Sequence, residues 1–335
     1  MPEPGPGEVL IRVLSSGVCG SDLHGYRRPR PDQPPAVGRE TGHELAGEVA
    51  GLGPGVTGFR VGQRVGIEPE HLVGCGLCDP CRRGDNHICT KRGVRHGESH
   101  GSHGFSQYDV CVSANVWPLP DHITLDQASV LDVYGCGVHA VNRYPVRPFS
   151  TAVVLGTGPI GMCVGQVAKA SGAKRVIMVG TRDEPLAVAL ASGAADEVVA
   201  NSRADPVKAI LELTGGEGAD VVFESVGGKA PTFGQAVQIA KPGGTVCVLG
   251  IFATNPQELD TRAGYRKELT ITWANSYSRY DGVSEYQIAL DLLATGRVKA
   301  DPLITHHYPL ERIAEGFVAA DDKRASGAIK VLIHP

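Results

Sequence analysis

Residues 17–24 place four reactive side chains close together, Cys19, Ser21, Asp22 and His24. Cys19 offers the soft thiolate that zinc selects, and Ser21 and His24 are near enough in sequence to form a hydrogen-bonded path for a proton. Each residue alone is weak evidence, because a single cysteine is usually a small core side chain and a single histidine is usually just hydrogen-bonded. A metal site at this stretch therefore needs further ligands.

His43 and Glu44 supply such ligands in the short sequence Gly-His-Glu. An imidazole and a carboxylate added to a thiolate make a donor set that suits zinc. We therefore expect Cys19, His43 and Glu44 to form one metal site, with Ser21 and His24 moving protons beside it.

Four further cysteines form the strongest local pattern in the chain, C-x2-C-x2-C-x7-C. Thiolates at this spacing can close a tetrahedral zinc shell that leaves no position for substrate, so we expect a structural zinc site on a lobe at about residues 74–90. An iron–sulfur cluster or idle thiols are the alternatives, although the spacing differs from both common ferredoxin patterns. The expected ligands are Cys75, Cys78, Cys81 and Cys89.

Short β-type stretches separated by glycine turns dominate the first third of the chain and predict a partly closed, barrel-like β-domain. Strands are expected at residues 8–13, 47–56, 62–67 and 104–110. Three histidines in a glycine-rich stretch, His96, His100 and His103, predict a polar loop and no further metal site, because so loose a backbone does not preorganise ligands.

From about residue 126 the pattern changes. Residues 125–132 and 137–141 are expected to be helical, and strands and helices then alternate. Residues 151–155 form a continuous apolar run suited to a strand buried on both faces, and this run leads into a G-x-G-x-x-G sequence that opens a helix. Further strands at 175–179, 219–223 and 244–249 complete a doubly wound parallel sheet. Backbone N–H groups at the helix N-terminus can approach a pyrophosphate, and the expected cofactor residues are Gly156, Gly158, Pro159, Ile160 and Gly161.

The type of cofactor is predicted by the residue about 20 positions after the glycine loop, where NAD sites carry Asp or Glu to bind the ribose. That position is Gly180, and the next two residues are Thr181 and Arg182, whose hydroxyl and guanidinium suit a phosphate. NADP is therefore expected in preference to NAD. In the alternative, Arg182 is a solvated turn residue and Asp183 holds the ribose, so NAD remains possible.

The last part of the chain needs a partner sheet. It contains an expected helix at 283–294, an extended piece at 302–308, a helix at 310–320 and a strand at 328–333. We expect these elements to return to the first domain. The predicted domains are therefore residues 1–132 with 277–335, and residues 133–276.

Composition excludes several classes of partner. A net charge of −4 gives no support for a nucleic-acid partner. No apolar run approaches the roughly 20 residues of a membrane span, and the start of the chain lacks the features of a signal peptide. These observations predict a cytoplasmic protein without a membrane partner, in which clustered cysteines bind metal instead of pairing.

A Cys/His/Glu set, a four-cysteine lobe and a dinucleotide-binding unit, in this order, resemble the zinc-dependent medium-chain dehydrogenase/reductase (alcohol dehydrogenase) superfamily over nearly the whole chain. The sequences Gly-Val-Cys-Gly-Ser-Asp-Leu-His and Gly-His-Glu are most similar to its branch of polyol (sorbitol-like) and threonine dehydrogenases. The resemblance implies an α/β protein with a GroES-like β-barrel catalytic domain and a Rossmann cofactor domain, assembled as a homodimer or homotetramer.

The resemblance also implies two zinc ions per chain. Cys19 and His43 would hold the catalytic ion, with the carboxylates of Glu44 and Asp132 bound directly or through water. The four clustered cysteines would hold the structural ion. The branch often has Glu in place of Asp132, whose side chain is one methylene shorter.

Further roles follow from the same resemblance. A proton relay would pass through Ser21, the cofactor ribose and His24, and Gly250 and Ile251 would line the nicotinamide pocket. The Gly-Thr-Arg sequence at residues 180–182 is similar to the Gly-Ser-Arg of NADP-using bacterial members. The family usually has two strands before the Pro-Gly-Pro-Gly-Glu segment on which this chain almost begins, which suggests a truncated or misassigned start.

The implied activity is hydride transfer between a nicotinamide cofactor and a secondary alcohol or polyol and its ketone, with zinc as Lewis acid. A threonine-type amino-alcohol dehydrogenase is the nearest alternative. A cofactor-binding protein without catalysis is an alternative from another class, because fold alone does not determine function. The complete Cys19, Ser21, His24, His43 and Glu44 set favours an enzyme, since a non-catalyst has no need of it.

Overall fold

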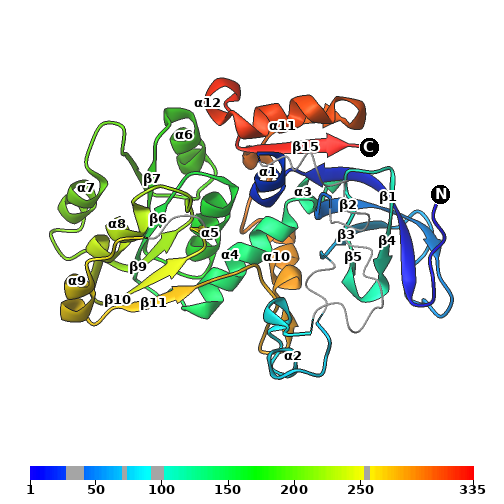
Figure 1. Cartoon of the computed structure of the whole chain (residues 1–335), viewed down its shortest axis with the longest axis horizontal. Helices are drawn as coiled ribbons and strands as arrows, with labels where there is room; N and C mark the ends of the chain where they lie inside the picture. Colours follow the sequence, from blue (N-terminus) through cyan, green and yellow to red (C-terminus); the bar gives the residue numbers. More distant parts are fainter. Residues whose placement is uncertain (28–40, 70–73, 92–101, 253–256) are drawn as a thin grey trace. The chain divides into compact units, whose positions relative to one another are not determined.

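The computed structural model describes residues 1–27, 41–69, 74–91, 102–252 and 257–335 (Figure 1). Two of the three loop histidines, His96 and His100, lie outside the described residues. The chain divides into two compact units. One contains Met1–Asp132, Ser278–Ala294 and Leu303–Pro335, and the other contains Val133–Tyr277 and Thr295–Pro302.

The first unit is built on a seven-stranded sheet in the order β14-β15-β1-β2-β3-β5, with β4 also paired to β1. Strand β1 is central, because β15, β2 and β4 all pair with it in antiparallel fashion. Alternate apolar side chains of these strands form a closed core, including Val9, Ile11 and Val13. The strands are β1 (Glu8–Gly17), β2 (Glu44–Leu52), β3 (Arg64–Ile67), β4 (Tyr108–Val112), β5 (Val116–Pro118), β14 (Ile304–Pro309) and β15 (Lys330–His334).

Short helices connect the strands of this unit. Those before the second unit are α1 (Gly20–Tyr26), α2 (Asp79–Arg82), η2 (Asn86–Ile88), η3 (Ser113–Asn115) and α3 (Leu125–Ala128). Those after it are α10 (Glu285–Ala294), η5 (Leu310–Arg312), α11 (Ile313–Asp321) and α12 (Lys323–Ser326). Helix α11 packs on β14 and β15, so the tail of the chain joins the same sheet as the first strand.

Several sequence expectations in this unit are wrong at their edges; the strand expected at 47–56, for example, is β2, which runs from Glu44 to Leu52. The expected helix at 283–294 begins only at Glu285, because Val283 pairs with Tyr280 in a hairpin of β12 (Arg279–Tyr280) and β13 (Val283–Ser284). Its two-residue turn is Asp281-Gly282, and both residues have positive φ (48° and 83°), the conformation that Asp-Gly turns favour.

The strand expected at 104–110 begins only at Tyr108. The residues before it form a turn, in which the Ser106 hydroxyl donates to the backbone oxygens of His103 and Tyr108 at 2.6 and 2.7 Å. His103 is therefore part of an ordered turn, and its N–H donates to Asp109 at 2.9 Å.

The second unit is a six-stranded parallel sheet in the order β11-β10-β9-β6-β7-β8. Read from β6, this is the strand order 3-2-1-4-5-6 of dinucleotide-binding sheets, and the order reverses between β6 and β9. The strands are β6 (Thr151–Leu155), β7 (Arg175–Gly180), β8 (Glu197–Ala200), β9 (Ala219–Glu224), β10 (Ala240–Val248) and β11 (Thr270–Trp273). A ligand site is expected where the order reverses.

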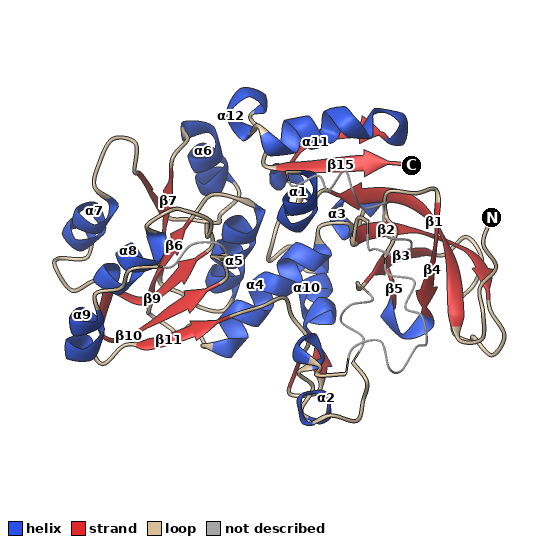
Figure 2. Cartoon of the chain, viewed as in Figure 1, coloured by secondary structure: helices blue, strands red, loops and turns tan. Residues whose placement is uncertain are grey.

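Helices surround this sheet (Figure 2). They are α5 (Pro159–Ala170), α6 (Asp183–Ala191), α7 (Pro206–Leu213), α8 (Thr232–Ile239) and α9 (Thr261–Lys267). Helix α4 (Leu131–Arg143) begins in the first unit and continues into the second, and η4 (Asp301–Leu303) leads back to β14. The central strands β6, β7 and β9 are buried on both faces, which explains their apolar runs.

Among the helices of the described residues, none combines the length and the apolar character needed to cross a lipid bilayer.

Candidate metal and cofactor sites

Cys19, His43 and Glu44 come together at the end of the central strand of the first unit. One ligand atom from each residue lies within 4.8 Å of the others. Cys19 follows β1 and is the N-cap of α1, and Glu44 is the first residue of β2, which pairs with Gly17 at the end of β1. Strand pairing therefore brings Cys19 next to two donors that lie 24 and 25 residues later in the sequence.

Lys330 is a member of this site that the sequence did not point to. Its side chain is 2% exposed, that of Glu44 is 1% exposed, and the two form an ion pair. The Lys330 ammonium also donates to the backbone oxygen of Val18 at 3.2 Å. Gly17 makes this contact possible, because a Cβ there would meet the Glu44 carboxylate and lie 3.0 Å from Cε of Lys330.

The electrostatics around His43 suit a cation. Burial alone would lower the pKa of His43, but its hydrogen bond to Cys19 and the negative charges of Cys19, Asp132 and Glu44 raise it well above the usual range. Asp132 is buried and acts on both His43 and Lys330 through its charge. A soft thiolate, an imidazole and carboxylates are the donors that zinc takes, so the residues present fit this ion.

Helix α1 holds the other reactive residues of the first stretch. The N–H of Cys19 donates to Asp22 at 2.8 Å, which caps the helix, and burial raises the pKa of Asp22. Ser21 and His24 are three residues apart on this helix and both are exposed. Residues at this spacing lie on the same face of a helix, so both can serve one path.

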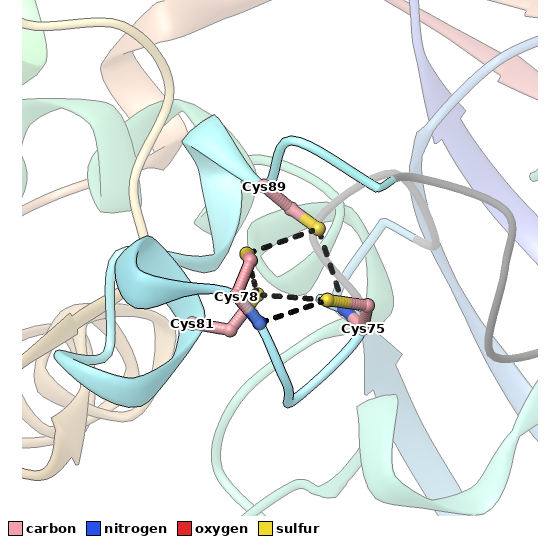
Figure 3. A group of neighbouring side chains, drawn as sticks. All are labelled: Cys75, Cys78, Cys81 and Cys89. Carbon is pink, nitrogen blue, oxygen red and sulfur yellow. Dashed lines mark hydrogen bonds between the residues drawn. The ribbon is translucent and has the colours of Figure 1, made fainter.

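The four-cysteine lobe forms a compact sulfur cluster (Figure 3). The sulfur atom of Cys78 lies 3.4 Å from that of Cys81 and 3.8 Å from that of Cys89, and those of Cys75 and Cys81 are 4.0 Å apart. A tetrahedral shell with Zn–S bonds of about 2.3 Å places its sulfurs about 3.8 Å apart. The cluster thus has the dimensions of a closed zinc site.

Backbone N–H groups favour thiolates in this lobe. Those of Cys78 and Leu77 donate to Cys75 at 3.3 and 3.4 Å, and bonds of this kind lower the pKa of Cys75. A bond from the N–H of Cys81 lowers the pKa of Cys78 to about 6. Burial raises the pKa of Cys81 to about 12, so without a metal this thiol keeps the proton that coordination displaces.

The glycine loop of the second unit lies between β6 and α5, at the point where strand order reverses. Gly158 is the N-cap of α5 and Pro159 is its first residue, followed by Ile160. A Cβ on Gly158 would meet no atom within 4 Å, whereas one on Gly161 would collide with the backbone oxygen of Gly156. The loop therefore packs tightly against its own helix and leaves open space at the helix N-terminus, as a pyrophosphate site requires.

Glu224 organises the neighbouring edge of the site, although no sequence motif points to this residue. Its fully buried carboxylate accepts from the N–H groups of Val226 and Gly227 at 2.8 and 3.0 Å and from the Thr232 hydroxyl at 2.7 Å. A Cβ on Gly250 would meet this carboxylate and the backbone N of Gly227. Glu224 thus fixes the turn on which Gly250 packs, and the next residue, Ile251, is 58% exposed.

The residues after β7 carry no acid at the ribose position. A Cβ on Gly180 would lie 2.5 Å from Cγ2 of Thr157, so this position is packed against the glycine loop. Asp183, the first acid beyond it, forms an ion pair with Arg203 at 2.8 Å. The hydrogen bond from Arg203 lowers the pKa of Asp183.

A β-unit with clustered zinc-type donors and a parallel sheet with an open glycine loop define a zinc-binding, dinucleotide-dependent oxidoreductase. Comparisons with known proteins agree. Residues 5–121 match the alcohol dehydrogenase GroES-like domain, and residues 159–295 match the zinc-binding dehydrogenase domain.

The chain is 32% identical to a sorbitol dehydrogenase of Halalkalibacterium halodurans, over 100% of this chain and 94% of that protein. It is 36% identical to an L-threonine 3-dehydrogenase of Pyrococcus horikoshii, over 92% of this chain and 86% of that protein. The crystal structure of a zinc-binding dehydrogenase from Sinorhizobium meliloti bound to NADP superposes with a TM-score of 0.86 at 29% identity, covering 100% of this chain and 94% of that one.

The chain therefore belongs to the zinc-dependent alcohol dehydrogenase superfamily of medium-chain dehydrogenases and is an oxidoreductase. This confirms the fold and the family that the sequence motifs predict, and the cofactors of the family are zinc and a nicotinamide dinucleotide.

Proposed function

We propose that this enzyme interconverts a secondary alcohol or polyol and its ketone, using a zinc ion at Cys19, His43 and Glu44. The observation that carries this proposal is the meeting of these three donors within 4.8 Å around a buried, negatively charged position. Zinc bound there supplies Lewis acidity toward the substrate oxygen.

The protein side chains handle the proton and the charge. Ser21 accepts the alcohol proton and His24 passes it to solvent, since both lie on the exposed surface of α1. Glu44 and Asp132 balance the charge of the ion, directly or through water. Lys330 holds the Glu44 carboxylate in one orientation, because the ammonium is itself fixed by the Val18 carbonyl.

A second zinc ion at the four-cysteine lobe has a structural role. The sulfur spacings and the N–H bonds to sulfur support this assignment, as does the position of the lobe against the β12 segment. The N–H of Asn86 donates to the Ser278 hydroxyl at 2.8 Å, and the N–H of Arg279 donates to the Gly84 carbonyl at 3.3 Å. A closed shell therefore fixes a lobe on which the returning chain is docked.

NADP is the preferred cofactor in this proposal. It would bind along Gly156 to Gly161, with its nicotinamide end at Gly250 and Ile251. Two features support the preference: Gly180 has no room for the acid of an NAD site, and Asp183 is paired with Arg203. Thr181 and Arg182 would then bind the 2′-phosphate.

A threonine-type amino-alcohol dehydrogenase is the second candidate, favoured by the 36% identity to the Pyrococcus enzyme. The proposed location is the cytoplasm, where thiols stay reduced. The proposed assembly is a homodimer or a homotetramer.

The test is an activity assay on a panel of polyols, cyclitols, short secondary alcohols and β-hydroxy amino acids. Turnover of each substrate is measured by nicotinamide absorbance, once with NAD and once with NADP. We expect the highest kcat/KM with a polyol or secondary alcohol and NADP. If L-threonine gave the highest kcat/KM, the second candidate would be selected. If neither the alcohols nor the amino acids were turned over, both candidates would be contradicted.

A further inference from the structure

A third cluster of metal-type donors lies in the first unit and shares no residue with the two described above. It combines Asp126 of α3, His307 of β14 and His334 of β15. One ligand atom from each lies within 4.8 Å of the others. The Asp126 carboxylate is 3.7 Å from Nδ1 of His307. It is 3.8 Å from Nδ1 of His334, the ring nitrogen that does not face His307.

The hydrogen bonds of His334 determine which of its atoms can bind a metal. Its Nδ1 lies 3.0 Å from the backbone oxygen of Leu14. A carbonyl only accepts, so Nδ1 carries the proton and Nε2 keeps its lone pair. Histidines that bind metals usually donate their other ring N–H to a carbonyl or carboxylate in this way.

His307 presents its Nδ1 to this lone pair at a distance of 3.0 Å. Two nitrogens bound to one ion at about 2.0–2.1 Å are about 3.0–3.4 Å apart, depending on the coordination geometry. Without a metal, Nδ1 of His307 carries a proton and donates a hydrogen bond to Nε2 of His334. When a metal binds, this proton moves to Nε2 on the half-exposed ring and both facing nitrogens become ligands.

The backbone holds all three residues in place. In the parallel ladder of β14 and β15, His307 is opposite Leu332 and Pro309 is opposite His334, which puts both histidines on one face of the sheet. Asp126 lies in the first turn of α3, and that turn is fixed by the Thr124 capping box. Donors on regular elements are preorganised before an ion arrives.

We propose that Asp126, His307 and His334 form a third metal site, which binds a divalent transition ion such as Zn²⁺. Two imidazoles and a carboxylate suit zinc, and the partial exposure of all three side chains lets water complete the shell. The bound ion joins α3, β14 and β15. It therefore stabilises the edge of the sheet formed by β14 and β15, and β15 begins with Lys330.

The experiment uses untagged enzyme with its other zinc sites filled and excess metal removed by a chelating resin. Calorimetric titration with ZnCl₂ should show one further saturable equivalent per chain, and zinc should raise the Tm. His307→Asn, His334→Gln and Asp126→Asn should each weaken this equivalent about tenfold or more and remove the rise in Tm.

The matched control is His306→Asn, which removes a neighbouring imidazole on the same strand. Nδ1 of His306 contacts the Thr305 hydroxyl at 3.0 Å, and His306 is not part of the cluster. This variant should bind the further equivalent as the parent does. Circular dichroism and the content of the other zinc ions check that each variant is folded. No further equivalent in the parent, or equal weakening in the control, would overturn the proposal.

Discussion

Lys330 and Glu44 form a buried ion pair that joins the last strand of the chain to the residue next to His43. Burial alone would lower the pKa of Lys330, but the charges of Glu44, Cys19 and Asp132 raise it, so the ammonium remains charged. The pair therefore couples the return of the C-terminal segment to the arrangement of the metal ligands.

The first prediction follows from this pair. Lys330→Met should lower the free energy of unfolding by about 3–5 kcal/mol, because it leaves the carboxylate of Glu44 buried without its partner. Denaturant unfolding measures this loss, and a chelator competition should show altered zinc affinity. The double variant Lys330→Met with Glu44→Gln should recover part of the stability. A double variant no more stable than the single one would contradict the role of the pair.

The second prediction separates the two zinc sites. Cys19→Ser should abolish turnover with little change in Tm, whereas Cys81→Ser should lower the Tm and remove one zinc ion, because a closed thiolate shell contributes folding energy. Metal analysis, thermal unfolding and activity of both variants test it. If the two variants lost equal stability and kept comparable activity, the assignment of separate roles would fail.

The third prediction concerns the proton path. His24→Ala should reduce alcohol oxidation on the order of 10²-fold, most strongly at acidic to neutral pH, and small buffer bases should restore part of the rate. The measurement is a pH–rate profile at several buffer concentrations. An unchanged profile without buffer rescue would show that His24 does not carry the proton.

The fourth prediction concerns the cofactor. Arg182→Ala should raise the KM for NADP about 10–100-fold with little effect on NAD, because a charge-assisted hydrogen bond contributes about 1.5–3 kcal/mol. Steady-state kinetics with both cofactors measure the difference. Arg203→Ala is a second test: it removes a nearby guanidinium and releases Asp183, so by the same reasoning it should improve the use of NAD and leave the contact of Arg182 with NADP intact. A parent enzyme with the higher kcat/KM for NAD, or an equal loss with both cofactors, would refute the preference.

The parallel sheet and the four-cysteine cluster were predictable from local sequence, whereas the cluster of Asp126, His307 and His334 was not. Continuous apolar runs such as Thr151–Leu155 identify strands buried on both faces, and the cysteine spacing identifies the lobe. Strand β8 and the segment α9–β11 were missed. The four residues of β8 are only partly buried apart from Val199, so they lack a continuous apolar run.

The residues missed at the sites have a different cause. Lys330 and Glu224 are charged residues at the ends of largely apolar strands. Lys330 is buried against a partner distant in sequence, and Glu224 is buried against groups that a turn folds back onto it. A pattern of neighbouring residues contains no information on such partners. The two shifted boundaries at Tyr108 and Glu285 arose from turns, of which only Asp281-Gly282 has a recognisable signal in the sequence.

The contact between Gly180 and Thr157 constrains how this enzyme can change its cofactor during evolution. An aspartate at position 180 would bring its Cβ within 2.5 Å of Thr157 Cγ2, so the single substitution disturbs the glycine loop before it can bind a ribose. Replacing Thr157 by Gly or Ala first removes this atom. We therefore expect the two positions to be epistatic, with a smaller residue at position 157 favouring an acid at position 180.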